Sequence, residues 1–400
     1  MLSVQPLLFD ARIQKEAIAL RDDGWDVHVW HVDDRALRAS VPNERELQEA
    51  LDKALTGIRV HSALLASRQW RQLPRVINWA LQALELLIRG LAHVFRCGAD
   101  IYHCHDLEPG VFGLTGRLAG ARLVYDAHEV EVRSPNPVLR FVQAMYERTV
   151  VLFSDRVITV NASIAELMRR KYGRPVSVIM NQPARVPIEA QDTTLLRRQA
   201  GCPEGSPILL YVGYVHPYAR GIERVIDALG LLPGISFVIL GVGRLRAFRE
   251  HIETYVREES PEAAGRVIFL PPVPPHLVIS YTSGADCSVM LYGRDVSKDM
   301  ATPNKLFESI VARVPILGTD TPLLRQYILE NEVGPIGDVV DPADRNAVAA
   351  KIRKLLSADA QRTMRANAGA LSSRVGWDFQ ARVLVDLYRQ IGRLTAESAS

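Results

Sequence analysis

Short apolar runs alternate with longer amphipathic stretches along most of the chain. Runs rich in Val and Ile that are separated by helical patterns are typical of parallel sheets built from β-α-β units. We expect strands of the first half at 26–31, 101–104, 123–125, 156–160 and 177–180. We expect strands of the second half at 208–212, 236–240, 267–270, 287–291, 315–318 and 339–340. Two doubly wound α/β sheets explain this number of strands better than one very wide sheet.

The boundary between the two halves is predicted at residues 181–187, which are rich in proline and lack periodicity. A final helical pattern covers 377–391 and carries apolar residues such as Phe379, Val383 and Leu387 at helical spacing. The chain therefore contains two domains and a closing helix.

Composition excludes several classes of protein. A length of 400 residues leaves room for two cores, and 48% hydrophobic with 23% charged residues is typical of a globular protein in water. A net charge of +3 is too mild to indicate nucleic-acid binding, so we expect no nucleic acid partner. The four cysteines show no C-x-x-C spacing, and the start has no signal-peptide pattern, so we expect reduced thiols and a cytoplasmic location.

One basic and apolar stretch, Arg68 to Arg96, includes Trp70, Trp79, Arg71 and Arg75. It is too interrupted to span a bilayer. Two interpretations stay open. The stretch is either a core-facing helix with a solvated arginine face, or an amphipathic helix in peripheral contact with the anionic inner face of a membrane.

The pattern around residue 303 predicts a helix start that suits an anion. Thr302 is a good N-cap and Pro303 a good first helical residue, so unpaired N–H groups are expected there. These groups and the helix dipole favour a phosphate. Glu308 lies more than one turn further on, where its carboxylate can accept hydrogen bonds from sugar hydroxyls. Together these features indicate a nucleotide ligand.

The segment TPNKLFE at 302–308, followed by VPILGTD at 314–320, resembles the donor-binding element of retaining glycosyltransferases of family 4. The segments ADIYHCHDLEPG at 99–110, RLVYDAHEVE at 122–131 and ILLYVGYVHPYARGIERVIDAL at 208–229 resemble that family in the same order.

The resemblance implies the GT-B fold, in which two doubly wound Rossmann-like domains face a central cleft and a C-terminal helix crosses back to the first domain. It implies an acceptor domain at 1–185 that also includes 376–400, and a donor domain at 186–375.

The activity implied by the resemblance is transfer of a sugar from a nucleoside diphosphate sugar to an acceptor hydroxyl with retention of configuration. Polysaccharide or glycoconjugate biosynthesis is the expected context, and the acceptor would be a glycan, a lipid-linked molecule or a small molecule. Family 4 members generally need no metal, so we expect no cofactor and no metal ligands.

The resemblance assigns the donor to the second half of the chain. Arg220 and Lys305 would neutralise the diphosphate, since a guanidinium can form paired hydrogen bonds with phosphate oxygens. The other residues implied in donor binding are Gly213, Tyr214, Gly241, Pro303, Asn304, Leu306 and Glu308. A glycine at a strand end lets a ligand approach the backbone. Tyr214 stands where the family usually has Arg, and Gly213 can also be a plain turn glycine.

In the first half, the resemblance implies that His128 reaches the donor sugar near the reacting centre, where it would orient a hydroxyl and shape the charge. The alternative is a hydrogen-bonded structural histidine. His103 and His105 share one face of a strand, and two ligands are too few for a structural zinc site. The resemblance favours acceptor binding by His105 or Asp106, with a structural role as the alternative.

One departure from the family bears on activity. Many members carry an E-x7-E pattern, and Met300 stands where its first Glu is expected, while Asp295 and Asp299 are nearby acids. A GT-B-like subunit that binds a nucleotide or a glycan without catalysis is therefore an alternative function. A sugar-nucleotide epimerase is a further alternative, but the cluster of catalytic acids that it would need is not evident.

Overall fold

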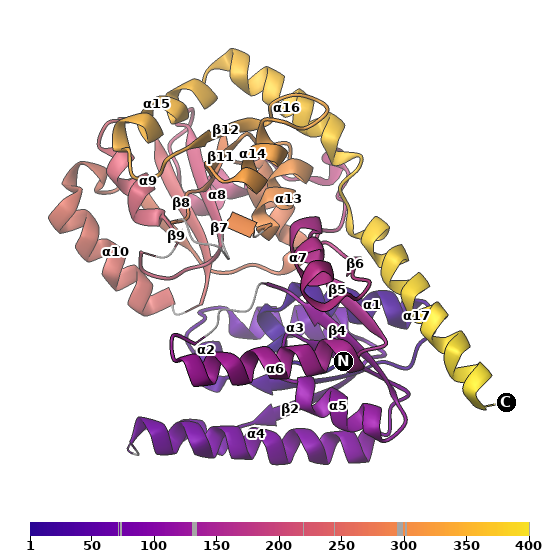
Figure 1. Cartoon of the computed structure of the whole chain (residues 1–400). Coiled ribbons are helices and arrows are strands. Elements are labelled where there is room, and N and C mark those ends of the chain that lie inside the picture. The colour runs from indigo at the N-terminus through magenta and orange to yellow at the C-terminus, as the bar shows by residue number, and fades with distance from the viewer. Residues whose placement is uncertain are drawn as a thin grey trace. The chain divides into compact units, whose positions relative to one another are not determined.

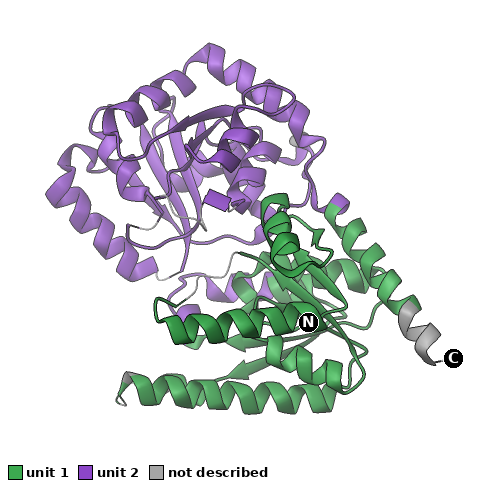
Figure 2. Ribbon diagram, in the orientation of Figure 1, with its two compact units in different colours: residues 1–35, 51–181, 380–400 green, residues 36–50, 182–379 purple. Residues whose placement is uncertain are grey.

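The computed structural model of the chain describes residues 1–70, 72, 74–129, 134–218, 220–243, 245–293, 299–300 and 302–399 (Figure 1). The chain divides into two compact units (Figure 2). Unit 1 comprises 1–35, 51–181 and 380–400, and unit 2 comprises 36–50 and 182–379. Each unit is built on its own parallel sheet. The prediction of two Rossmann-like α/β domains is confirmed.

Unit 1 alternates strands and helices. Its strands are β1 (His28–Asp33), β2 (Arg59–Leu64), β3 (Ile101–His105), β4 (Arg122–Ala127), β5 (Arg156–Thr159) and β6 (Ser177–Val178). Its helices are η1 (Leu7–Phe9), α1 (Ala11–Asp22), η2 (Ala66–Gln69), α4 (Arg75–Cys97), α5 (Gly110–Leu118), α6 (Pro137–Phe153) and α7 (Ala162–Tyr172). The short α2 (Arg35–Arg38) and α3 (Glu44–Ala54) adjoin the segment 36–50, which groups with unit 2.

The sheet of unit 1 is parallel throughout. β3, β4, β5 and β6 pair in that order, and β1 pairs with β2. Leu2 bridges Trp30 of β1 and Cys104 of β3, which joins the two groups of strands. Because parallel crossovers are right-handed, α4, α5, α6 and α7 cover one face of this sheet and α1 covers the other.

Unit 2 repeats the same plan. Its strands are β7 (Ile208–Tyr214), β8 (Ser236–Val242), β9 (Val267–Leu270), β10 (Cys287–Met290), β11 (Ile316–Thr319) and β12 (Gly337–Val340). Its helices are η3 (Ile188–Ala190), α8 (Leu195–Ala200), α9 (Ile222–Leu229), α10 (Leu245–Glu259), η4 (Pro261–Ala263), η5 (Pro275–Leu277), α11 (Val278–Ser283), α13 (Asn304–Val311), α14 (Pro322–Ile328), α15 (Arg345–Leu355) and α16 (Ala358–Ser372). The final helix α17 (Trp377–Ala399) begins in unit 2 and belongs to unit 1 from Gln380 onward.

The strand order in unit 2 is β12-β11-β10-β7-β8-β9, and all pairs are parallel. Within this sheet the first strand is β7. The chain continues to β8 and β9 on one side of β7 and then returns to β10 on its other side. The order therefore reverses between β7 and β10. In open α/β sheets, ligands bind at such a switch point, outside the carboxyl ends of the strands.

The predicted strands lie close to the observed strands, but strand β2 was not predicted. Most of its residues are at least partly exposed, so its side chains lack the apolar run that marked the other strands. The units change at 181/182 and 379/380, a few residues from the expected 185/186 and 375/376. No described helix is long and apolar enough to cross a bilayer.

Candidate functional site

Two glycines lie side by side at the carboxyl ends of β7 and β8. Gly213 and Gly241 are register partners in the parallel pair of strands. Gly213 has a φ of 122°, which favours glycine, and a Cβ placed there would lie 3.7 Å from the ammonium of Lys305. The backbone at this strand end is therefore open to close approach by a ligand.

Lys305 lies in the first turn of α13 and its side chain is buried. Its Nζ lies 3.5 Å from the ring centre of Tyr211 and 5.2 Å from that of Tyr292, which follows β10. Burial and the nearby charge of Arg220 lower the pKa of Lys305 well below its ordinary value, against the opposing effect of Glu308. An ammonium held by two aromatic faces gains cation–π stabilisation but has lost water.

Arg220 precedes α9, beside the same strand ends. Its Cζ lies 5.8 Å from the ring centre of Tyr214, and its buried Nε has no hydrogen-bond partner among the described residues. Gly221 follows with a φ of 68°, and a Cβ there would lie 1.5 Å from the carbonyl oxygen of Leu291. Glycine at position 221 thus allows α9 to start directly against β10 and presents Arg220 at the switch point.

The start of α13 differs by one residue from the prediction. Pro303, not Thr302, is the N-cap, and its side chain makes no capping hydrogen bond because proline offers none. Asn304 is exposed at the first helical position. Leu306 is fully buried and donates its backbone N–H to Pro303 at 2.9 Å, so its side chain is a core contact. Glu308 is partly exposed one turn further on.

The acids near the missing Glu are only partly described. Asp295 lies outside the described residues. Asp299 and Met300 are described and partly buried.

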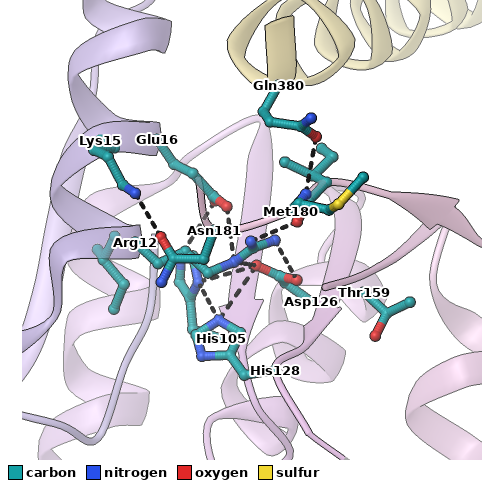
Figure 3. Close-up of polar contacts among 12 residues, drawn as sticks. Arg12, Lys15, Glu16, His105, Asp126, His128, Thr159, Met180, Asn181 and Gln380 are labelled. Atoms are coloured by element: carbon teal, nitrogen blue, oxygen red, sulfur yellow. Dashed lines mark hydrogen bonds and ion pairs between the residues drawn. The ribbon is translucent and has the colours of Figure 1, made fainter. Parts of the chain in front are cut away.

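A second polar cluster lies in unit 1 at the carboxyl ends of β3 and β4 (Figure 3). Asp106 has a φ of 64°, an uncommon conformation outside glycine, and its carboxylate accepts the backbone N–H of His128 at 3.0 Å. The His128 ring lies between two carboxylates, with Nδ1 3.3 Å from Asp106 and Nε2 3.3 Å from Asp126. The His128 side chain is 19% exposed, so it borders solvent.

Arg12, on α1, binds a carboxylate and a backbone carbonyl of this cluster. Its Nε and Nη2 donate to the two oxygens of Asp126 at 2.7 and 2.9 Å, and Nη1 donates to the carbonyl of Ile179 at 2.6 Å (Figure 3). Although burial alone would raise it, Arg12 and His128 hold the pKa of Asp126 well below its ordinary value. Asp126 is therefore a carboxylate fixed by a bidentate ion pair.

Asp126 and Asp106 determine the charge of His128. Burial opposes a charge on the ring, but Asp106 and Asp126 outweigh this and raise the pKa of His128 to about 10. His128 is thus an imidazolium at neutral pH, held at the edge of the cluster. Burial raises the pKa of Asp106 to about 6, with the His128 charge opposing the shift.

Behind His128 lies a fully buried group. The rings of His103 and His105 are stacked at 4.3 Å, and His103 Nδ1 lies 2.9 Å from the hydroxyl of Tyr388 on α17. Both Nε2 atoms, and both carboxylate oxygens of Glu16, lack hydrogen-bond partners among the described residues. Burial raises the pKa of Glu16 to about 8, against the opposing effect of Arg12.

This buried group contains more atoms of the kind that bind metal ions than His103 and His105 supply alone. Within the described ranges, Glu16, His103, His105 and Asp126 place such atoms within 4.8 Å of one another. The Arg12 guanidinium is 3.0 Å from Glu16 and 2.7 Å from Asp126, so a cation of the chain already pairs with both carboxylates. This arrangement suits a charge-balanced support for His128.

Sequence reasoning did not assign Arg12, Glu16 or Asp126 to the site. A signal was present, because Arg12 and Glu16 stand four residues apart on the face of α1 that also carries the buried Ile13 and Ala17. Charged residues on an apolar helix face are buried with partners. Tyr211 and Tyr292, around Lys305, were also missed. Both read as ordinary strand-end aromatics in the sequence.

Comparison with known proteins identifies the two halves. Residues 10–183 match the family model of the glycosyl transferase 4-like domain, and residues 192–371 match that of glycosyl transferases group 1. The cluster around His128 lies within the first match, and the strand ends around Lys305 lie within the second.

Similar proteins cover most of the chain. A D-inositol 3-phosphate glycosyltransferase of Xylanimonas cellulosilytica is 28% identical over 337 residues, which are 76% of this chain and 75% of that protein. A protein of the same description from Thermomonospora curvata is 24% identical, covering 72% of this chain and 71% of its own length.

Two solved structures share the fold across the whole chain. The sucrose-phosphate synthase of Thermosynechococcus elongatus has a TM-score of 0.71 at 19% identity, with 98% of this chain and 99% of that chain covered. HepE of Anabaena in complex with UDP-glucose has a TM-score of 0.67 at 15% identity, with 99% of each chain covered. With both halves matched in this order and this fold, the chain is a GT-B glycosyltransferase of group 1.

Proposed function

We propose that the chain transfers a sugar from a nucleoside diphosphate sugar to an acceptor hydroxyl with retention of configuration, in polysaccharide or glycoconjugate biosynthesis. The observation that carries this proposal is the convergence of Gly213, Arg220 and Lys305 at the switch point of unit 2. A partly exposed glycine backbone suits a diphosphate when it lies beside Lys305, which can take up a proton, and near an arginine with an unpaired buried N–H.

In this proposal, unit 2 binds the donor. Arg220 and Lys305 contact the diphosphate, and the backbone N–H of Asn304 at the start of α13 adds a helix N-terminal donor. Glu308 accepts hydrogen bonds from the ribose. Stabilisation of the departing diphosphate by these charges is the main catalytic contribution, so no metal is needed.

Unit 1 would bind the acceptor and contribute His128. As an imidazolium between two aspartates, His128 would place a positive charge beside the donor sugar at its solvent-facing edge. Asp106 is the group in this cluster that is exposed enough to contact an acceptor. His105 is buried, so it would act through His128, whose Nε2 lies 3.2 Å from His105 Nδ1.

The identity of the nucleotide is the first part of the proposal to test. A thermal-shift and calorimetric screen of UDP, GDP and ADP should identify one nucleotide, and UDP is a first choice because HepE has been solved with UDP-glucose. A transfer assay with the matching sugar donors would follow. Its acceptor panel should include D-inositol 3-phosphate, after the description of the relatives.

Arg220→Ala and Glu308→Ala should each weaken nucleotide binding at least about tenfold and lower turnover. Arg224→Ala is a matched control, because this exposed arginine lies in α9 just after Arg220 and forms an ion pair with Asp227. Unchanged turnover in both site variants would show that the assigned site is wrong.

A non-catalytic subunit is the alternative, and Met300 in place of the expected Glu is the observation that favours it. Such a subunit would be stabilised by a nucleoside diphosphate yet would neither hydrolyse nor transfer the sugar of any donor in the panel. Transfer of sugar by the purified chain would exclude it.

A further inference from the structure

Most of the exposed large apolar side chains in the described part of the chain lie on three helices of unit 1. Of 21 such side chains, 15 belong to α4, α5 and α6. Those on α4 are Val76, Ile77, Trp79, Leu84, Leu87, Ile88 and Phe95. Those on α6 are Val138, Leu139, Phe141, Val142, Met145, Leu152 and Phe153, and α5 ends with Leu118. We call these 15 residues the apolar surface.

The three helices form one layer. Right-handed crossovers place them on the same face of the unit 1 sheet. Gly90 of α4 packs against Phe112 of α5, and Gly110 of α5 packs against Val150 of α6, so α5 lies between the other two. Figure 1 shows α4 and α6 running along the same side of unit 1. Their outward sides therefore belong to the same helical layer of unit 1.

Within α4, the exposed residues are ordered along the helix. Ile77, Leu84, Ile88 and Phe95 are spaced by seven, four and seven residues. With about 3.6 residues per turn, this spacing gives a straight stripe along the helix. The stripe faces away from Gly90 and Val94, which are buried.

The same order holds in α6, where Val138, Val142, Met145 and Leu152 are spaced by four, three and seven residues. Buried Glu147, which follows Met145 by two residues, faces the interior. Exposed apolar stripes on two helices of one layer are typical of an interaction surface.

The charges on these helices are mainly basic. α4, α5 and α6 carry six arginines and two glutamates. The two carboxylates are engaged, since Glu85 accepts backbone N–H groups of η2 and Glu147 is buried against Lys171 at 2.6 Å. Arg96, Arg140 and Arg148 are exposed. The exposed apolar side chains of α4 and α6 are therefore accompanied by exposed arginines on the same two helices.

We propose that the apolar surface docks unit 1 onto an anionic lipid bilayer, with α4 and α6 lying in the interface. Arginines can extend to lipid phosphates while the apolar stripes enter the acyl boundary. A second copy of the chain fits less well, because an isologous contact would bring these arginines against their own symmetry mates. The docking surface extends the stretch Arg68 to Arg96 by the whole of α6, and it does not depend on the proposed activity.

The apolar part is tested with the full chain and vesicles of phosphatidylcholine, with or without phosphatidylglycerol. The chain should co-sediment with the anionic vesicles. Serine replacements at Ile88, Phe95, Val142 and Met145 together should lower the bound fraction at least about tenfold. Because these side chains are exposed, the thermal unfolding midpoint should change little.

The contribution of the arginines to vesicle binding is tested with a variant that combines Arg96→Gln, Arg140→Gln and Arg148→Gln. This variant should lose its preference for anionic over neutral vesicles, and added salt should have the same effect on the unchanged chain. Leu167→Ser with Val383→Ser is the matched control, since both side chains are exposed and apolar but lie on α7 and α17. The control should bind like the unchanged chain.

Two results would overturn the proposal. One is equal vesicle binding by the unchanged chain and the four-serine variant. The other is that the unchanged chain does not bind vesicles but runs as a dimer on gel filtration, and that the four-serine variant runs as a monomer. That result would assign the apolar surface to contact with a second copy.

Discussion

The guanidinium of Arg12 donates two hydrogen bonds to the carboxylate of Asp126, at 2.7 and 2.9 Å, with both side chains buried in unit 1. The contact joins α1 to β4, across 114 residues of sequence. It fixes the carboxylate that faces His128 and so links the core of unit 1 to the edge of its polar cluster.

Removing one partner of this pair should be costly. Arg12→Met removes the bidentate partner of a buried carboxylate, so the free energy of unfolding should fall by about 3–5 kcal/mol in denaturant titrations. Arg170→Met, which breaks an exposed pair with Glu166, is the control and should cost less than about 1 kcal/mol. Combining Arg12→Met with Asp126→Leu should recover part of the loss. A double variant no more stable than Arg12→Met would contradict this account.

His128 should remain an imidazolium well above neutral pH. Its folded pKa of about 10 lies above the ordinary 6.5, so its contribution to stability is complete below about pH 6.5 and is lost as pH rises through 10. Imidazole NMR signals of His128 followed against pH measure this directly. Asp106→Asn should lower the His128 pKa, whereas Glu108→Gln, an exposed neighbour in sequence, should leave it nearly unchanged. Titration of His128 near pH 6.5 in the unchanged chain would refute the prediction.

Nucleotide binding should be accompanied by proton uptake at Lys305. The pKa of Lys305 is held well below its ordinary value by burial, and a bound diphosphate would favour the charged form. Affinity for the nucleotide should therefore fall as pH rises. Calorimetry in two buffers of different ionisation enthalpy should give different apparent enthalpies, and Lys305→Met should abolish the difference. Identical enthalpies with the unchanged chain would count against a role for Lys305.

Gly221→Ala should disturb the switch point more than an ordinary left-handed glycine does. At Gly205, with a φ of 74° and no neighbour within 4 Å of an added Cβ, the change to Ala should cost about 1–2 kcal/mol. At Gly221 the added Cβ meets the Leu291 carbonyl, so roughly 1–3 kcal/mol more is expected in the free energy of unfolding. Equal costs at the two positions would show that α9 moves freely away from β10.

Much of the fold could be predicted because its strands are buried on both faces. β7 and β8 appear in the sequence as continuous apolar runs, and their glycine ends appear as breaks after those runs. β2 escaped prediction because an edge strand with exposed residues has no such run. The sequence predicts Thr302 as the cap, whereas the structure has Pro303, since a helix boundary depends on backbone angles that the sequence pattern does not determine.

The donor residues were predicted as separate pieces of chain. The sequence predicts Gly213, Arg220 and Lys305 one by one. Their proximity, and the two tyrosines around Lys305, depend on the order of the strands in the sheet. Leu306, expected in the site, is fully buried. A sequence motif does not show whether one of its leucines contacts a ligand or packs in the core.

By itself the sequence determined the two α/β units, the linker between them and the glycosyltransferase resemblance, because local patterns of apolar residues and turns are enough to encode these. The tertiary structure decided which charges are buried together. Arg12, Glu16 and Asp126 are not neighbours in the sequence pattern, yet they are buried together. Asp126 and Asp106 raise the pKa of His128, since a pKa depends on neighbours in space. The tertiary structure also decided that α6 joins α4 in one apolar surface, because the exposure of a helix face depends on what packs against it.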